Sequence, residues 1–120
     1  MKKNMIGLNE HDLKIIRVLE TFGYNKPKAK CYLFFQMFEI ATAKEIEDTV
    51  YEAQPCINIA LNEMLREGLL STRTIHHAGK GRPILEYHRK VLPFVFVEER
   101  ATEKIKSIQR NLELLYTVLR

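Results

Sequence analysis

The sequence has little cysteine and no long hydrophobic run. Its two cysteines, Cys31 and Cys56, stand far apart without CxxC spacing, which argues against a disulfide framework and favours two plain thiols. No run of about 18 apolar residues is present, so no segment is expected to span a membrane. Residues 1–6 are followed by neither the apolar core nor the cleavage site of a signal peptide. We therefore expect a cytoplasmic protein.

Motifs of catalysis and cofactor binding are also missing. The sequence contains no GxSxG, HExxH or GxGxxG motif and no paired carboxylates, so we do not expect an enzyme. His76, His77 and His88 lie close together, but Glu86 is the only further ligand type nearby, so we predict no metal site and no cofactor. The glycine-rich stretch at residues 79–82 lacks the spacing of a phosphate-binding P-loop.

The positive charge is concentrated in one short segment. The chain has 120 residues, a net charge of +4 and 46% hydrophobic residues, enough for one compact domain plus at most one added element. Residues 71–90 carry five Lys or Arg against one acidic residue, whereas residues 1–70 carry nine against ten and residues 91–120 five against four. Such a segment suits contact with phosphates, because neutralised phosphates release counterions. The alternative is a solvated basic loop.

The first forty residues predict two helices. Asn9 can cap a helix whose apolar face ends at Phe22 before Gly23. Pro27 suits the first turn of a second helix, which is apolar on most sides and is expected to form the core. Three lysines at its start oppose the helix dipole and need solvent or an anionic partner such as phosphate. They are Lys26, Lys28 and Lys30.

Residues 42–66 predict two further helices joined by a tight turn. Thr42 and Glu45 have capping-box spacing, residues 51–53 form the turn, and Pro55 starts the next helix. The buried face of that helix carries Ile57, Ala60, Leu61, Met64 and Leu65. Its outward face carries Gln54, Cys56, Asn58, Ile59, Asn62 and Arg66. Amides there can pair with adenine edges and Ile59 can contact thymine methyl groups; the alternative is that these are simply exposed residues. A further hypothesis is oxidant sensing by Cys56, an outward thiol at the start of this helix.

A β-hairpin follows this helix. Gly68 ends the helix, and strands are expected over residues 69–76 and 84–90, with a glycine-rich tip between them. The element order predicts a mainly α (α+β) winged helix-turn-helix fold with a two-stranded wing, and hence binding to double-stranded DNA. The residues expected to contact the DNA backbone and minor groove are Arg73, Lys80, Arg82, Thr42 and Lys44.

The segment from Pro93 to Arg120 reads as one long helix with a heptad pattern. Its apolar seam begins with Phe94 and Ala101. Five later positions, spaced 3, 4, 3 and 4, are predicted to form a dimer: Ile105, Ile108, Leu112, Leu115 and Leu119. The alternative is that this stripe docks on the first helix of its own chain. We accordingly expect a DNA-binding domain over residues 1–92 and a dimerisation helix over residues 93–120.

Residues 22–93 resemble the DNA-binding domain of the archaeal TrmB-like family of winged helix-turn-helix regulators. The matching segments are Phe22-Gly23, residues 29–33, Ala-Thr-Ala-Lys-Glu-Ile at 41–46, Leu61 with Met64, residues 68–70, and Gly81-Arg82-Pro83 with Tyr87. MarR-like and PadR-like regulators share the outline less closely. Tyr51-Glu52 stand where the family usually has Gly and a small apolar residue.

The resemblance implies a transcriptional regulator that binds operator DNA as a homodimer, with the helix after the turn in the major groove and the wing on the flanking backbone. Larger family members continue into a sugar-binding effector domain, for which this sequence has no room after residue 120. Neither the operator nor a small-molecule effector can be inferred. The alternative function is a winged-helix module that binds another protein without specific DNA binding.

Overall fold

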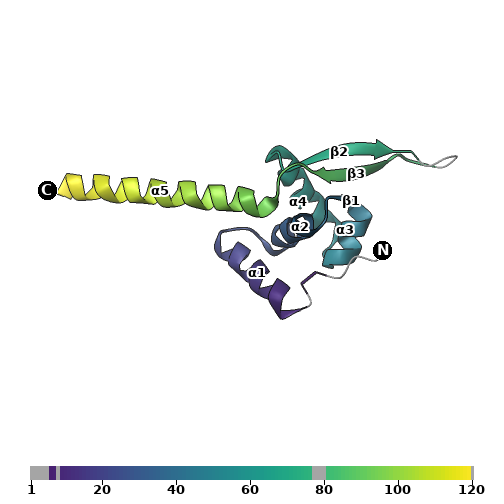
Figure 1. Cartoon of the computed structure of the whole chain (residues 1–120), viewed down its shortest axis with the longest axis horizontal. Helices are drawn as coiled ribbons and strands as arrows, with labels where there is room; N and C mark the ends of the chain where they lie inside the picture. The colour runs from purple at the N-terminus through teal and green to yellow at the C-terminus, as the bar shows by residue number, and fades with distance from the viewer. Residues whose placement is uncertain (1–5, 8, 77–80, 120) are drawn as a thin grey trace.

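A computed structural model of the chain describes residues 6–7, 9–76 and 81–119. Within these ranges, a bundle of four helices carries a small sheet on one side and a long fifth helix that projects away from it (Figure 1). The elements are α1 (Glu10–Thr21), α2 (Lys26–Met37), β1 (Ile40–Thr42), α3 (Ala43–Val50), α4 (Gln54–Arg66), β2 (Leu70–Ile75), β3 (Ile84–Arg89) and α5 (Pro93–Leu119). The fold is therefore the predicted winged helix-turn-helix with a long C-terminal helix.

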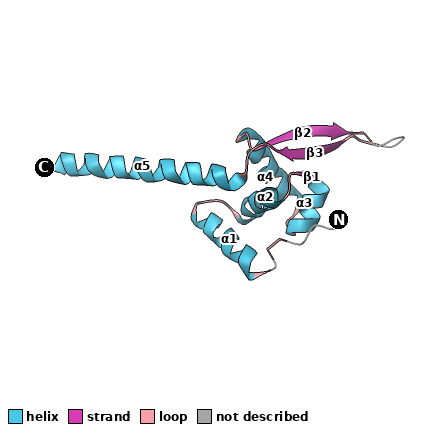
Figure 2. Cartoon of the chain, in the orientation of Figure 1, coloured by secondary structure: helices cyan, strands magenta, loops and turns pink. Residues whose placement is uncertain are grey.

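The sheet has one strand more than the sequence predicts. The two strands of the hairpin pair antiparallel, from Leu70 opposite Arg89 to Ile75 opposite Ile84. The short strand β1 pairs with the other edge of β3, with Ala41 opposite Tyr87, so the strand order is β1-β3-β2 (Figure 2). The predicted two-stranded wing is confirmed by β2 and β3. The additional strand β1 was not predicted, because a strand of three residues has no recognisable alternation of its own.

Helix ends follow the local sequence signals. The side chain of Asn9 accepts a hydrogen bond of 2.7 Å from the backbone N–H of Asp12 at the start of α1. Thr42 and Glu45 form a reciprocal capping box at the start of α3, since each side chain accepts from the backbone N–H of the other. Both predicted caps are confirmed. Gly68, with φ of +80°, ends α4 in the left-handed conformation that glycine adopts readily.

The core is built around α2. Tyr32, Phe34 and Phe35 are fully buried, and the ring of Phe34 lies 5.1 Å from that of Phe35 and 5.0 Å from that of Phe38. Buried side chains from the surrounding elements pack against this helix; among them are Ile16, Leu19, Ile46, Val50, Ile57, Leu61, Met64 and Leu69. Burial of this kind is the main stabilising term for the domain. The prediction that the second helix forms the core is thus confirmed.

The base of α5 is attached to the same helix. The backbone N–H of Phe94 donates a 3.0 Å hydrogen bond to Oε1 of Gln36, Val97 is buried, and the ring of Phe96 lies 6.4 Å from that of Tyr32. Beyond its first turns the helix extends into solvent, away from the sheet (Figure 1). No helix in the described ranges combines the length and the apolar character needed to cross a membrane.

Candidate nucleic-acid interface

Helix α4 presents one face to the core and the other to solvent, as its sequence predicts. Its inner side chains Ile57, Ala60, Leu61 and Met64 are buried. All six predicted outward residues are exposed: Gln54, Cys56, Asn58, Ile59, Asn62 and Arg66. Ile59 is 58% exposed although it is apolar. The outer face of α4 therefore offers amide groups, one guanidinium and one apolar side chain to an external surface.

A buried polar network fixes α4 to α2. Lys28, which is 8% exposed, places Nζ at 2.7 Å from Oε2 of Glu67 and 3.0 Å from Oε1 of Glu63, both on the α4 side. Tyr32 donates a 2.8 Å hydrogen bond to the other carboxylate oxygen of Glu67. Charge-assisted hydrogen bonds of this kind are directional, so the network sets the orientation of α4 as well as its distance from α2.

Burial acts on the protonation of this network. Desolvation by itself lowers the pKa of Lys28, but the hydrogen bonds with Glu67 and Glu63 outweigh it and raise that pKa above its ordinary value. Burial, and then the hydrogen bond to Glu67, raise the pKa of Tyr32 above 10.0. Both groups therefore keep their protons throughout the neutral range.

Two of the three lysines at the start of α2 find anionic partners within the protein. Lys28 is paired with the two glutamates described above, and Lys30 places Nζ 2.7 Å from Glu52 and donates to the carbonyl of Val50 at 2.9 Å. The anionic partners are therefore carboxylates of the same chain. Local spacing could not show this, because Glu52 is 22 positions from Lys30. Lys28 and Lys30 are therefore poor candidates for phosphate contact, whereas Lys26 is exposed.

The turn between α3 and α4 contains an unusual residue. Tyr51 ends α3 with φ of 54°, and it is the one non-glycine residue with positive φ in the described ranges. This is the left-handed region, which favours glycine. Glycine would therefore suit this position, and the Cβ atom of Tyr51 makes its backbone conformation unfavourable. Glu52, the next residue, is held by Lys30.

Two of the residues predicted to contact the DNA backbone lie at the start of α3. The hydroxyl of Thr42 is engaged in the capping box with Glu45. Lys44 is exposed, and its Nζ lies 3.3 Å from Oδ1 of Asp48 one turn later. Exposed pairs of this kind contribute little to stability, so Lys44 can exchange its partner at small cost.

The wing exposes some of its basic residues and uses another to hold its strand to the core. Arg73 and Arg82 are exposed, and Gly81 at the tip has φ of +67°. Arg89 instead donates to the backbone carbonyl of Phe35 at 3.0 Å, so its charge serves the packing of β3 on α2. The predicted residues His77, Gly79 and Lys80 lie outside the described residues.

The described histidines and cysteines do not gather into a site. Nε2 of His88 lies 2.7 Å from Oε1 of Glu86 on the same face of β3. Among the residues that the structure describes, no group of three His, Cys, Asp or Glu could hold a metal ion. Cys56 is an exposed free thiol on α4, whereas Cys31 is buried in the core, and burial raises its pKa to about 12. Cys31 is therefore an unreactive thiol at neutral pH.

Two solved structures share this fold. The transcriptional regulator homologue from Pyrococcus horikoshii OT3 superposes with a TM-score of 0.53 at 17% identity, covering 83% of this chain and 95% of that one. TrmBL2, described as an archaeal chromatin protein with a novel mode of DNA binding, superposes with a TM-score of 0.52 at 19% identity over 85% of this chain. This chain spans 39% of the TrmBL2 chain. No protein-family model matches the sequence, and a search of curated proteins gives no match. The structural likeness confirms the predicted resemblance to TrmB-like winged-helix regulators at the level of the fold.

Proposed function

We propose that this protein is a transcriptional regulator that binds specific sequences of double-stranded DNA as a homodimer. The observation that carries the proposal is the outer face of α4, where Asn58, Ile59 and Asn62 are exposed on a helix that buried contacts hold firmly to the core. Amides and small apolar groups on a rigid helix are suited to reading base edges in the major groove. The proposed role is binding without catalysis, and the place of action is the cytoplasm.

The wing supports the same function. Arg73 on β2 and Arg82 near the tip are exposed on a hairpin that follows α4 directly in the chain. In this proposal they contact phosphates or the minor groove beside the site read by α4. Lys44 and Thr42, at the start of α3, contact the DNA backbone. The two proteins named above share the fold, and one of them, TrmBL2, is a chromatin protein that binds DNA.

The first experiment measures how duplex affinity depends on salt. Fluorescence anisotropy with a labelled duplex should give a logarithm of affinity that falls linearly with the logarithm of salt concentration. Arg82→Ala should reduce that slope by about one unit and weaken binding to every sequence alike. Arg110→Ala is the matched control, because it removes the same charge from the exposed surface of α5. Binding that does not respond to salt would favour the alternative, a module that binds proteins.

The second experiment tests the reading helix. A preferred site is first selected from random duplex DNA, and Asn58→Ala is then compared with the unaltered protein on that site and on random duplex. Loss of an amide contact to a base should cost about 1 to 3 kcal/mol on the preferred site only. An unchanged preference for that site would refute the assignment of α4 as the reading helix.

The proposed dimer uses the heptad seam of α5. Ile105, Ile108, Leu112, Leu115 and Leu119 are all exposed in the single chain, with Leu115 at 53% and Leu119 at 72%. The alternative interpretation is that this seam docks on the first helix of the same chain. Docking of that kind would cover these five side chains, and α1 does not cover them. A homodimer with twofold symmetry predicts a palindromic site with half-sites about 10 base pairs apart or a multiple of that.

A further inference from the structure

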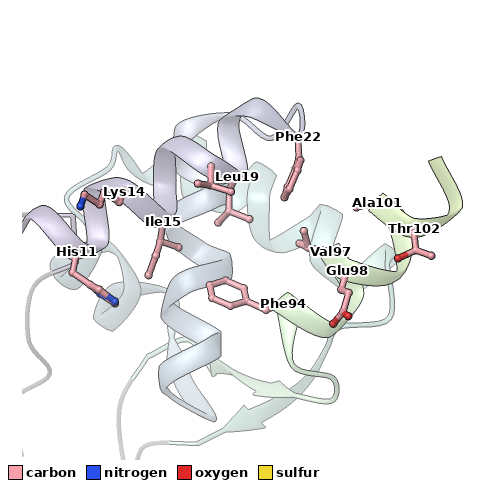
Figure 3. Close-up of a pocket in the computed structure, with 11 residues that line it drawn as sticks. His11, Lys14, Ile15, Leu19, Phe22, Phe94, Val97, Glu98, Ala101 and Thr102 are labelled. Atoms are coloured by element: carbon pink, nitrogen blue, oxygen red, sulfur yellow. The ribbon is translucent and has the colours of Figure 1, made fainter. Parts of the chain in front are cut away.

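Two apolar surfaces are left uncovered by the residues that the structure describes. The first is a groove of about 620 Å³ between α1 and the beginning of α5 (Figure 3). Its walls include Ile15 and Val18 from α1, Phe22 directly after that helix, and Phe94 and Ala101 from α5. Val18 is 51% exposed and Phe22 46% exposed. We call this the α1–α5 groove.

The second surface is the end of α5, which we call the α5 tip (residues 112–119). Six of its eight side chains are large apolar groups, and all six are exposed: Leu112, Leu114, Leu115, Tyr116, Val118 and Leu119. A seam of two helices uses the a and d positions, which here are Leu112, Leu115 and Leu119. Tyr116 and Val118 flank the seam and require additional cover.

We infer that two copies of this chain pair with their α5 helices antiparallel, so that the α5 tip of each copy occupies the α1–α5 groove of the other. This inference rests on the homodimer proposed above and adds its orientation and the occupant of the groove. In the antiparallel pair both apolar surfaces are covered at once. In a parallel pair the two tips meet each other, and both grooves stay empty.

The heptad positions fix the alignment. Residues 98, 105, 112 and 119 occupy a, and residues 94, 101, 108 and 115 occupy d. In an antiparallel pair each a position faces a d position of the other helix. One alignment overlaps the two helices along their whole length, and it places Ile105 against the partner's Ile108. The same alignment places Leu112 against the partner's Ala101 and Leu119 against the partner's Phe94.

Charge favours the same orientation. Glu98 is the single charged residue among the eight seam positions. In a parallel pair it would face the partner's Glu98, which sets two like charges against each other. In the antiparallel pair it faces the partner's Leu115. Glu98 lies in the wall of the groove and is exposed in the single chain (Figure 3).

Distances between spin labels separate the two orientations. In a Cys56→Ser background, Lys106→Cys places a label beside the crossing point, and Thr117→Cys places one near the tip, both at exposed positions. At a rise of about 1.5 Å per residue, the antiparallel pair separates the two labels at position 117 by about 32 Å along the axis and those at position 106 by about 2 Å. A parallel pair gives nearly equal distances at the two positions.

The expected result is a dimer in which the distance at position 117 is clearly longer than that at position 106. Equal distances in a dimer would overturn the antiparallel arrangement while leaving the proposed DNA-binding homodimer intact. A monomer in sedimentation equilibrium, with no coupling between labels at position 106, would overturn both the dimer and this inference.

A pair of substitutions on α1 tests the occupied groove by itself. Val18→Glu puts a carboxylate in the groove wall, and we expect it to raise the dimer dissociation constant about tenfold or more. Arg17→Glu is the matched control, because it puts the same group on the solvent side of α1 and should leave the constant nearly unchanged. An equally small effect of both changes would show that the tip does not enter the groove. Circular dichroism of each variant verifies that the domain stays folded.

Discussion

The winged-helix domain and α5 use apolar side chains in opposite ways. In the domain, residues such as Phe34 and Leu61 are completely buried, and the described ranges contain no buried side-chain polar atom without a partner. Along the second half of α5, Leu112 and Leu115 are as apolar and yet about half exposed. The domain is therefore self-sufficient, whereas α5 has a complete helical pattern but no core of its own. The difference separates the apolar side chains that a single chain covers from those that the proposed dimer would cover.

The largest effect is expected from truncating a core side chain, in contrast to the same kind of truncation on α5. Phe34→Ala leaves a cavity in the core and should lower the free energy of unfolding by about 3 to 5 kcal/mol. Leu115→Ala removes an exposed side chain and should leave the hydrogen exchange of the α2 amides nearly unchanged. Urea denaturation and hydrogen exchange measure both variants. A loss below about 1 kcal/mol for Phe34→Ala would mean that α2 is not the core of the domain.

A charge in the seam of α5 should affect assembly without affecting the domain. Leu112→Glu buries a carboxylate in the proposed dimer, so the dissociation constant is expected to rise about 100-fold, which corresponds to about 3 kcal/mol. The near-ultraviolet circular dichroism of the domain should not change. Arg110→Glu provides the control, since residue 110 lies away from the seam. Sedimentation equilibrium measures both, and equal dissociation constants would contradict dimerisation through this seam.

The polar network between α2 and α4 predicts alkaline sensitivity. A group whose pKa is higher in the folded than in the unfolded chain contributes its full stability below its unfolded value, and this is lost as the pH rises through the folded pKa. For Tyr32 and Lys28 the ordinary values are 10.0 and 10.5, and both pKa values are raised by folding. The free energy of unfolding should therefore be insensitive to these groups below about pH 10 and fall above it.

Tyr32→Phe isolates one part of this network. It removes the hydrogen bond to Glu67 and should cost about 2 kcal/mol at pH 7. It should also make the free energy of unfolding fall less steeply above pH 10, because the substitution removes one of the two groups whose pKa is raised by folding. Urea denaturation at several pH values measures both effects. Tyr51→Phe on the exposed turn before α4 is the control, and an unchanged fall in the free energy of unfolding above pH 10 in the Tyr32 variant would rule out this role of Tyr32.

The smallest effect is expected at the turn before α4. Tyr51→Gly relieves a left-handed backbone conformation and should raise the free energy of unfolding by about 0.5 to 1 kcal/mol. Tyr51→Ala keeps a Cβ atom and should give no such gain. Thermal unfolding of the two variants compares them directly. If both variants were equally stable, positive φ would not be the source of strain at this position.

The sequence predicted the features of the domain that depend on neighbouring residues. The cap at Asn9, the capping box of Thr42 and Glu45 and the two faces of α4 each depend on spacings of three or four positions, which a helix repeats. The heptad of α5 is of the same kind, and the structure confirms its helix over Pro93–Leu119.

What the sequence missed depends on distant partners. Lys28 finds Glu67 39 positions away, and Arg89 finds the carbonyl of Phe35 54 positions away, so neither pairing leaves a local pattern. The strand β1 exists because β3 runs beside it. For the candidate site, spacing indicated which residues face outward, but it could not show that Thr42 is engaged in its own cap. Only the folded chain separates basic residues that face outward from those that hold elements together.

The helix α2 contacts both parts of the molecule for which a function is proposed above. Near its N-terminal end, Lys28 and Tyr32 hold α4, and near its C-terminal end Gln36 holds the first turn of α5. In the proposed dimer, this helix would act as a rigid spacer between the subunit contact and each reading surface. One added base pair turns a half-site by about 35° around the duplex axis. A spacer without a hinge cannot follow that rotation, so a dimer of this kind would discriminate between operators by the interval between their halves as well as by their bases.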